Sequence, residues 1–150
     1  MIKLLVISDT HGDKKSIDYL VNTVSFDYLI HLGDGLNDLG QLEYMNNLIQ
    51  VRGNCDFFSK EKTDEYRVID GVKILMTHGQ NYGVKTTINN LAKKAYELDL
   101  DLVLYGHTHR PSKQTIGKTL FVNCGSLRHS HSFFIIEIDN GKILANLHSF

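Results

Sequence analysis

Short apolar runs alternate with segments of helical period in the first half of the chain. The apolar runs predict strands over residues 2–7, 27–31 and 48–52. After the first run, Asp13 can cap a helix whose apolar side chains follow i, i+3, i+4, i+7 spacing, namely Ile17, Leu20, Val21 and Val24. Strands and helices that alternate in this way are typical of a parallel sheet with crossover helices.

Two later segments also have helical spacing. One passes through Leu36, Leu39 and Leu42. The other carries Val84, Ile88, Leu91, Ala92 and Ala95. We interpret both apolar faces as parts of the core, which predicts a helix over each segment.

Two dipeptides that favour tight turns, Asp70-Gly71 and Asn140-Gly141, mark hairpins in the second half. The strand-like runs beside them are 65–69 and 72–76 for the first turn and 133–138 and 143–147 for the second. A further strand is expected over 118–122. The expected fold class is therefore α/β, a layered sandwich with mixed sheets.

Composition limits the class of protein. The chain has 150 residues, 42% hydrophobic and 22% charged, with a net charge of -1, which fits one globular domain over residues 1–150. The charge balance gives no global basic field, so we expect no nucleic-acid partner. No apolar run is long enough to cross a membrane, and the N-terminal run reads as a first strand rather than a signal peptide. Two unpaired cysteines, Cys55 and Cys124, fit reduced thiols, and we expect a cytoplasmic protein.

Five apolar runs end in a residue type that binds metals, which are Asp9, Asp34, Asn54, His78 and His107. The carboxyl ends of parallel strands face a common crevice, so these side chains are expected to converge there. Alternate residues of an extended backbone lie on one side, so His11 and His109 can reach the same place as Asp9 and His107. Oxygen and imidazole donors favour Mn²⁺, iron, Zn²⁺ or Mg²⁺.

The motifs DxH, GD, GN, H and GHxH occur in that order over almost the whole chain. In this the sequence resembles the calcineurin-like metallophosphoesterase superfamily. Within it, HLGD, VRGNCD, THG and YGHTHR look most like the small YfcE-type phosphodiesterases. The resemblance implies a four-layer αββα sandwich with two mixed β-sheets.

The resemblance also implies a metal-dependent hydrolase that cleaves a phosphoester, in particular a phosphodiester, with a hydroxide that bridges two divalent ions and is held by Asp34. Mn²⁺ is the first choice of metal, and Ni²⁺, Zn²⁺, Fe²⁺ and Mg²⁺ are the alternatives. Carried over by motif, one ion would bind Asp9, His11 and His109, the other would bind Asn54, His78 and His107, and Asp34 would bind both. A small phosphoester substrate and a homodimer or homotetramer are expected.

One departure from the pattern concerns the leaving group. Many members of the superfamily have GNH, whereas residues 53–56 read GNCD, so Cys55 stands where a proton-donating histidine is common. A thiol is a poorer proton donor at neutral pH, which favours substrates with good leaving groups. Asp56 and Cys55 are the candidates for assisting the leaving group, and Arg52 and Gln80 are the candidates for binding the phosphate.

Two alternatives stay open, a phosphomonoesterase and a catalytically weak scaffold, because the fold is similar to that of the retromer subunit that binds partner proteins. His31 is interpreted as a buried, hydrogen-bonded histidine outside the site. His129 is interpreted as a surface histidine that could touch substrate. The loop at Phe57 and Phe58 could lie beside the site or at an interface.

Overall fold

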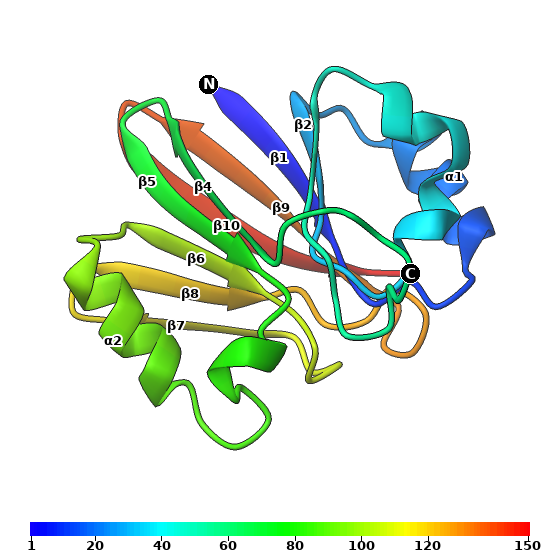
Figure 1. The fold of residues 1–150 in the computed structure, drawn as a ribbon. Coiled ribbons are helices and arrows are strands. Elements are labelled where there is room, and N and C mark those ends of the chain that lie inside the picture. Colours follow the sequence, from blue (N-terminus) through cyan, green and yellow to red (C-terminus); the bar gives the residue numbers. More distant parts are fainter.

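The computed structural model describes residues 1–150 and contains two five-stranded sheets packed face to face (Figure 1). Helix α1 (Lys14–Thr23) lies outside one sheet, and helix α2 (Asn89–Glu97) lies outside the other. Each sheet combines parallel and antiparallel pairs. This four-layer arrangement of helix, sheet, sheet and helix confirms the expected fold class.

The first sheet has the strand order β10-β9-β1-β2-β3. Its strands are β1 (Ile2–Ile7), β2 (Tyr28–His31), β3 (Leu48–Gln50), β9 (Ser132–Asp139) and β10 (Lys142–Ser149). The first three are parallel, as the alternating pattern predicts, and β9 runs antiparallel to β1. Asn140 and Gly141 both have positive φ, which confirms the predicted turn between β9 and β10.

The second sheet has the strand order β4-β5-β6-β8-β7. Its strands are β4 (Asp64–Ile69), β5 (Val72–Thr77), β6 (Leu102–Tyr105), β7 (Ser112–Ile116) and β8 (Thr119–Asn123). The hairpin at Asp70-Gly71 and the strand near 118–122 are confirmed. Strand β7 escaped prediction because it is an edge strand whose mostly polar side chains lie largely exposed, so it lacks an apolar face.

The helices follow the predicted apolar faces with two corrections. Asp13 caps α1 by accepting a hydrogen bond from the Ser16 N–H at 3.2 Å, as expected. The segment Leu36–Tyr44 (η1) is 3₁₀ helix rather than α-helix, and it kinks at Gly40. Helix α2 begins at Asn89 and not near Val84, because the short 3₁₀ turn Gln80–Tyr82 (η2) and the left-handed Gly83 precede it.

Three apolar clusters fill the spaces between the layers. The largest, with 18 buried residues, lies between the sheets and includes Leu4, Ile30, Ile74 and Leu104. The second lies between α1 and the first sheet, and the third lies between α2 and the second sheet. None of the helices has the length and apolar character needed to cross a membrane.

Candidate metal centre

The residues singled out by the sequence pattern follow the carboxyl ends of five strands. Asp9 follows β1, Asp34 follows β2 and Asn54 follows β3, while His78 follows β5 and His107 follows β6. The loops therefore come from both sheets. Six of the seven predicted ligand residues lie in two compact groups, each with its ligand atoms within 4.8 Å of one another.

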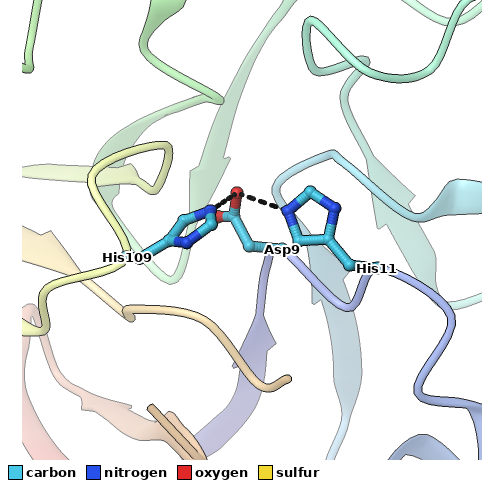
Figure 2. Close-up of side chains that lie close together, drawn as sticks. All are labelled: Asp9, His11 and His109. Carbon is cyan, nitrogen blue, oxygen red and sulfur yellow. Dashed lines mark hydrogen bonds and ion pairs between the residues drawn. The ribbon is translucent and has the colours of Figure 1, made fainter. Parts of the chain in front are cut away.

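The Asp9 group consists of Asp9, His11 and His109 (Figure 2). The Nε2 atoms of both histidines point at the same carboxylate oxygen, Asp9 Oδ1, at 3.1 Å from His109 and 3.6 Å from His11. The carboxylate is fully buried, whereas the histidines are partly exposed. The three donors thus converge on one point at the edge of the molecule.

The Asp34 group consists of Asp34, His78 and His107. His78 Nε2 lies 3.2 Å from Asp34 Oδ2 and 3.1 Å from His107 Nδ1. The same Asp34 oxygen lies 3.9 Å from Nε2 of His11 in the Asp9 group. One carboxylate oxygen of Asp34 is therefore close to histidines of both groups.

The histidine nitrogens are arranged as metal ligands need. His78 Nδ1 lies 2.8 Å from the Leu32 carbonyl, which can only accept, so this nitrogen carries the hydrogen and Nε2 is left to face the carboxylates. His11 Nε2 is buried and has no hydrogen-bond partner. Because an unpartnered buried nitrogen is costly, its place between two carboxylates fits a divalent cation.

The electrostatics of the centre keep Asp34 ionised. Burial alone would raise the pKa of Asp34, but the hydrogen bond and charge of His78 and the N–H of Cys55 lower it below its usual range. Burial lowers the pKa of His78, yet the bond to Asp34 and the charge of Asp9 raise it above the ordinary value. For His107, burial and the nearby His78 lower the pKa.

The backbone of the centre is unusual as well. Positive φ angles occur at five of the proposed ligands, which are Asp9, His11, Asp34, His107 and His109. Asp and His tolerate this left-handed region better than most residues. Gly53 is needed for a different reason, since a Cβ at this position would overlap the Asp34 carboxylate. The strand-end loops are therefore held in close contact.

The loop after β3 contacts Asp34 from a second side. The Cys55 N–H donates to Asp34 Oδ1 at 2.8 Å, while Asn54 itself is exposed and its side chain lies near the Cys55 sulfur. The Asp56 carboxylate accepts the N–H groups of Gly53, Asp34, Gly35 and Leu36. These contacts point to a positioning role for Asp56, and assistance of the leaving group stays a prediction. Burial and the nearby Asp34 raise the pKa of Cys55.

Arg52 and Gln80 lie together beside the centre. They line a hollow of about 310 Å³ with Asn54, Asp56 and Phe57. The Gln80 amide donates to the Arg52 carbonyl at 3.4 Å, and the Arg52 guanidinium donates to the Ser59 carbonyl at 3.2 Å. Phe57 and Phe58 are 79% and 96% exposed, so this loop lies outside the core, and Phe57 lines the hollow.

Two other histidines have different surroundings. His31 is fully buried and hydrogen-bonded to the Gly33 N–H and to the Thr10 hydroxyl, which confirms its interpretation as a core histidine. His129 lies against His11 and His109, with ring centroids 5.5 and 5.1 Å away. Sequence reasoning placed His129 on the surface and missed this contact. The sequence did offer a signal that His129 lies near the centre. Its loop follows the end of β8, just as the loops with the proposed ligands follow their strands.

Comparison with known proteins identifies the family. A model of the calcineurin-like phosphoesterase superfamily domain matches residues 2–141. The probable metallophosphoesterase YsnB of Bacillus subtilis is 30% identical in an alignment that covers 93% of this chain and 86% of that relative. The phosphodiesterase YfcE of Escherichia coli K12 is 25% identical in an alignment that covers 85% of this chain and 80% of that relative.

A solved structure shares the whole fold. Vps29 of Entamoeba histolytica, complexed with zinc, matches with a TM-score of 0.79 and 22% identity over 99% of each chain. At that identity the likeness shows the fold alone. The family model and the YsnB match each span most of the sequence, and the range of the family model contains every strand-end motif described above. The chain belongs to the calcineurin-like phosphoesterase superfamily.

Proposed function

We propose that this protein is a two-metal phosphoesterase that hydrolyses phosphodiesters. One observation carries the proposal, which is the position of Asp34 Oδ2 between the histidines of two separate donor groups. Such a shared carboxylate suits a pair of cations a few ångströms apart. The match to a phosphodiesterase in Escherichia coli supports a diester as the substrate.

In this proposal the six grouped residues and Asn54 hold two divalent cations. Asp9, His11 and His109 would hold one, Asn54, His78 and His107 would hold the other, and Asp34 would contribute to both. The zinc complex of Vps29 shows that a protein of this fold binds a divalent cation, and our first expectation for this chain remains Mn²⁺. A homodimer or homotetramer and a cytoplasmic location stay predictions.

Two divalent cations would lower the pKa of a water, orient the phosphate and neutralise charge on the attacking and leaving oxygens. The protein's own part is to keep the donors in place. Asp34 is fixed by the Cys55 N–H and its backbone by Asp56, while the Leu32 carbonyl holds the tautomer of His78. Arg52 and Gln80 line the hollow beside the centre together with Phe57, which supports their assignment as contacts of the phosphoester.

The test is metal reconstitution. Protein stripped of metal should hydrolyse bis(p-nitrophenyl) phosphate only after Mn²⁺, Ni²⁺, Zn²⁺ or Mg²⁺ is returned. Asp34→Asn should lose most of this activity, by about a hundredfold or more, because the shared charge between the groups is gone. The matched control is Asp18→Asn, an exposed carboxylate on α1 without a side-chain hydrogen bond.

Parallel assays with p-nitrophenyl phosphate separate a phosphodiesterase from a phosphomonoesterase. A faster diester reaction supports the proposal, and a faster monoester reaction assigns the site to monoesters. Equal rates in wild type and Asp34→Asn would contradict a two-metal centre.

The likeness to Vps29 keeps a protein-binding scaffold with weak catalysis as the second candidate. The two candidates differ in whether the protein hydrolyses phosphoesters when metal is bound. Wild type that binds metal but hydrolyses neither chromogenic substrate would favour the scaffold. The complete set of donors at the two groups favours the enzyme.

A further inference from the structure

Three imidazole rings form a triangle at the edge of the centre. The ring centroids of His11 and His109 are 5.2 Å apart. The ring centroid of His129 lies 5.5 Å from that of His11 and 5.1 Å from that of His109. The rings of His129 and His109 are stacked at an interplanar angle of 18°. His129 therefore covers one side of both histidines of the Asp9 group.

The backbone of the His129 loop is tied directly to Asp9. The buried Ser126 hydroxyl donates to the Asp9 carbonyl at 2.7 Å and accepts the His129 N–H at 2.9 Å. The Leu127 N–H donates to the Ser8 carbonyl at 3.0 Å. These hydrogen bonds fix the backbone position of His129. The conformation of the loop after β8 therefore determines where its side chain starts.

The His129 side chain itself has a free hydrogen-bond donor. The residue is exposed, and no hydrogen bond of the protein involves its ring nitrogens. An imidazole carries at least one N–H in either protonation state. The neighbouring Arg128 is exposed too and adds positive charge to the same loop. An anionic group at the Asp9 group would thus lie near an unused donor, carried by a ring whose centroid is 5.1 Å from that of His109.

We propose that His129 is a substrate-binding residue whose ring N–H donates a hydrogen bond to a phosphoryl oxygen of the ester bound at the Asp9 group. The inference rests on the proposed function and adds a contact to it. It places one side of the phosphate against His129, while the hollow at Arg52 and Gln80 is left for the remainder of the substrate.

Substitutions can separate the donor from the ring. His129→Phe keeps a flat ring for stacking but has no donor, and His129→Gln keeps an N–H donor without the ring. The matched control is His148→Phe, because His148 is an exposed histidine that stacks on Phe133 at 5.4 Å, on β10, and contacts no ligand residue. Each protein is first titrated calorimetrically with Zn²⁺ and then, when loaded, with inorganic phosphate.

We expect Zn²⁺ affinity to stay within about threefold of wild type in all variants, since His129 is not a ligand. Phosphate should bind about tenfold more weakly to His129→Phe, and His129→Gln should recover most of that loss. With Mn²⁺ and bis(p-nitrophenyl) phosphate, KM should rise in the same order while kcat changes less. His148→Phe should match wild type.

Two results would overturn the inference. Unchanged phosphate affinity in His129→Phe would show that the ring only packs. Equal loss of Zn²⁺ affinity in both His129 variants would show that the residue merely supports His109. Both results can be obtained while wild type remains an active, Asp34-dependent hydrolase. A wild type that neither binds phosphate nor turns over substrate when loaded would instead overturn the proposed function together with this contact.

Discussion

At the residue scale, His31 links two loops of the centre but belongs to neither donor group. Its Nδ1 accepts the Gly33 N–H at 3.0 Å, so Nε2 carries the hydrogen and lies 3.1 Å from the Thr10 hydroxyl. That hydroxyl donates to Asp38 at 2.7 Å. Burial lowers the pKa of His31 to about 4, so the imidazole is neutral in the folded protein at neutral pH.

This shift predicts a loss of stability in mild acid. The unfolded chain takes up a proton at His31 below its ordinary pKa of 6.5, whereas the folded chain resists it down to about 4. The contribution is fully present above the unfolded pKa and declines through that window. Between pH of about 7.5 and about 4.5, the metal-free wild type should lose roughly 2.5 kcal/mol more than His31→Gln. Urea unfolding of both proteins at the two pH values measures the difference, and parallel losses would contradict it.

At the scale of elements, the centre depends on how the loops after β2 and β3 hold each other. Four backbone N–H groups from these loops converge on the Asp56 carboxylate, at 2.7 to 3.1 Å. A carboxylate accepts at both oxygens, which is what this ring of donors requires. The loop after β3 therefore carries Asn54 and also sets the backbone of Asp34.

Asp56→Asn should consequently weaken both the fold and the centre. One amide nitrogen would face backbone N–H donors, so about two hydrogen bonds are lost and the free energy of unfolding should fall by about 2 kcal/mol or more. Affinity for Mn²⁺ should fall as well, because Asp34 loses its support. Thermal unfolding and calorimetry measure the two effects, with Asp18→Asn as the reference. An Asp56→Asn protein of normal stability that had lost only turnover would point to a role with the leaving group instead.

The elements also show where sequence reasoning succeeds. Asp70-Gly71 and Asn140-Gly141 could be identified as turns because positive φ is a local demand that few residues meet. The clustering of the strand-end donors was predictable from the sequence, because Asp9, Asp34, His78 and His107 each follow an apolar run. The start of α2 was not, since Val84 is buried against the same cluster as Leu91 without being helical. The His129 contact depends on a tertiary stack between distant loops. The position of its loop after β8 places His129 near the strand ends but does not specify the rings on which it packs.

At the scale of the whole molecule, the centre connects the two sheets. Asp9 and Asp34 come from the first sheet, whereas His78, His107 and His109 come from the second. The apolar cluster between the sheets draws on both. One domain over residues 1–150 stays a prediction. Cations bound by donors of both sheets would add a second connection at the open edge.

Metal should therefore stabilise the entire fold. A cation that binds only the folded protein adds about 2.7 kcal/mol at a concentration one hundred times its Kd. Wild type should show a rise in Tm with added Zn²⁺, and His78→Asn should lose most of that rise because a donor of the second sheet is missing. Scanning calorimetry with and without Zn²⁺ measures the effect. An equal rise in both proteins would place the bound metal elsewhere.

The left-handed backbone of the centre limits which substitutions can be tolerated there during evolution. It occurs at Asp9, His11, Asp34, His107 and His109. Glutamate would keep the negative charge of an aspartate, but its longer side chain has no special tolerance for positive φ. Asparagine tolerates that conformation as well as aspartate does and removes the charge. The substitution with the smallest backbone cost is thus the one that removes a charge from the proposed metal centre. A lineage with this architecture can abandon hydrolysis in a single codon change while its fold remains fit for other uses.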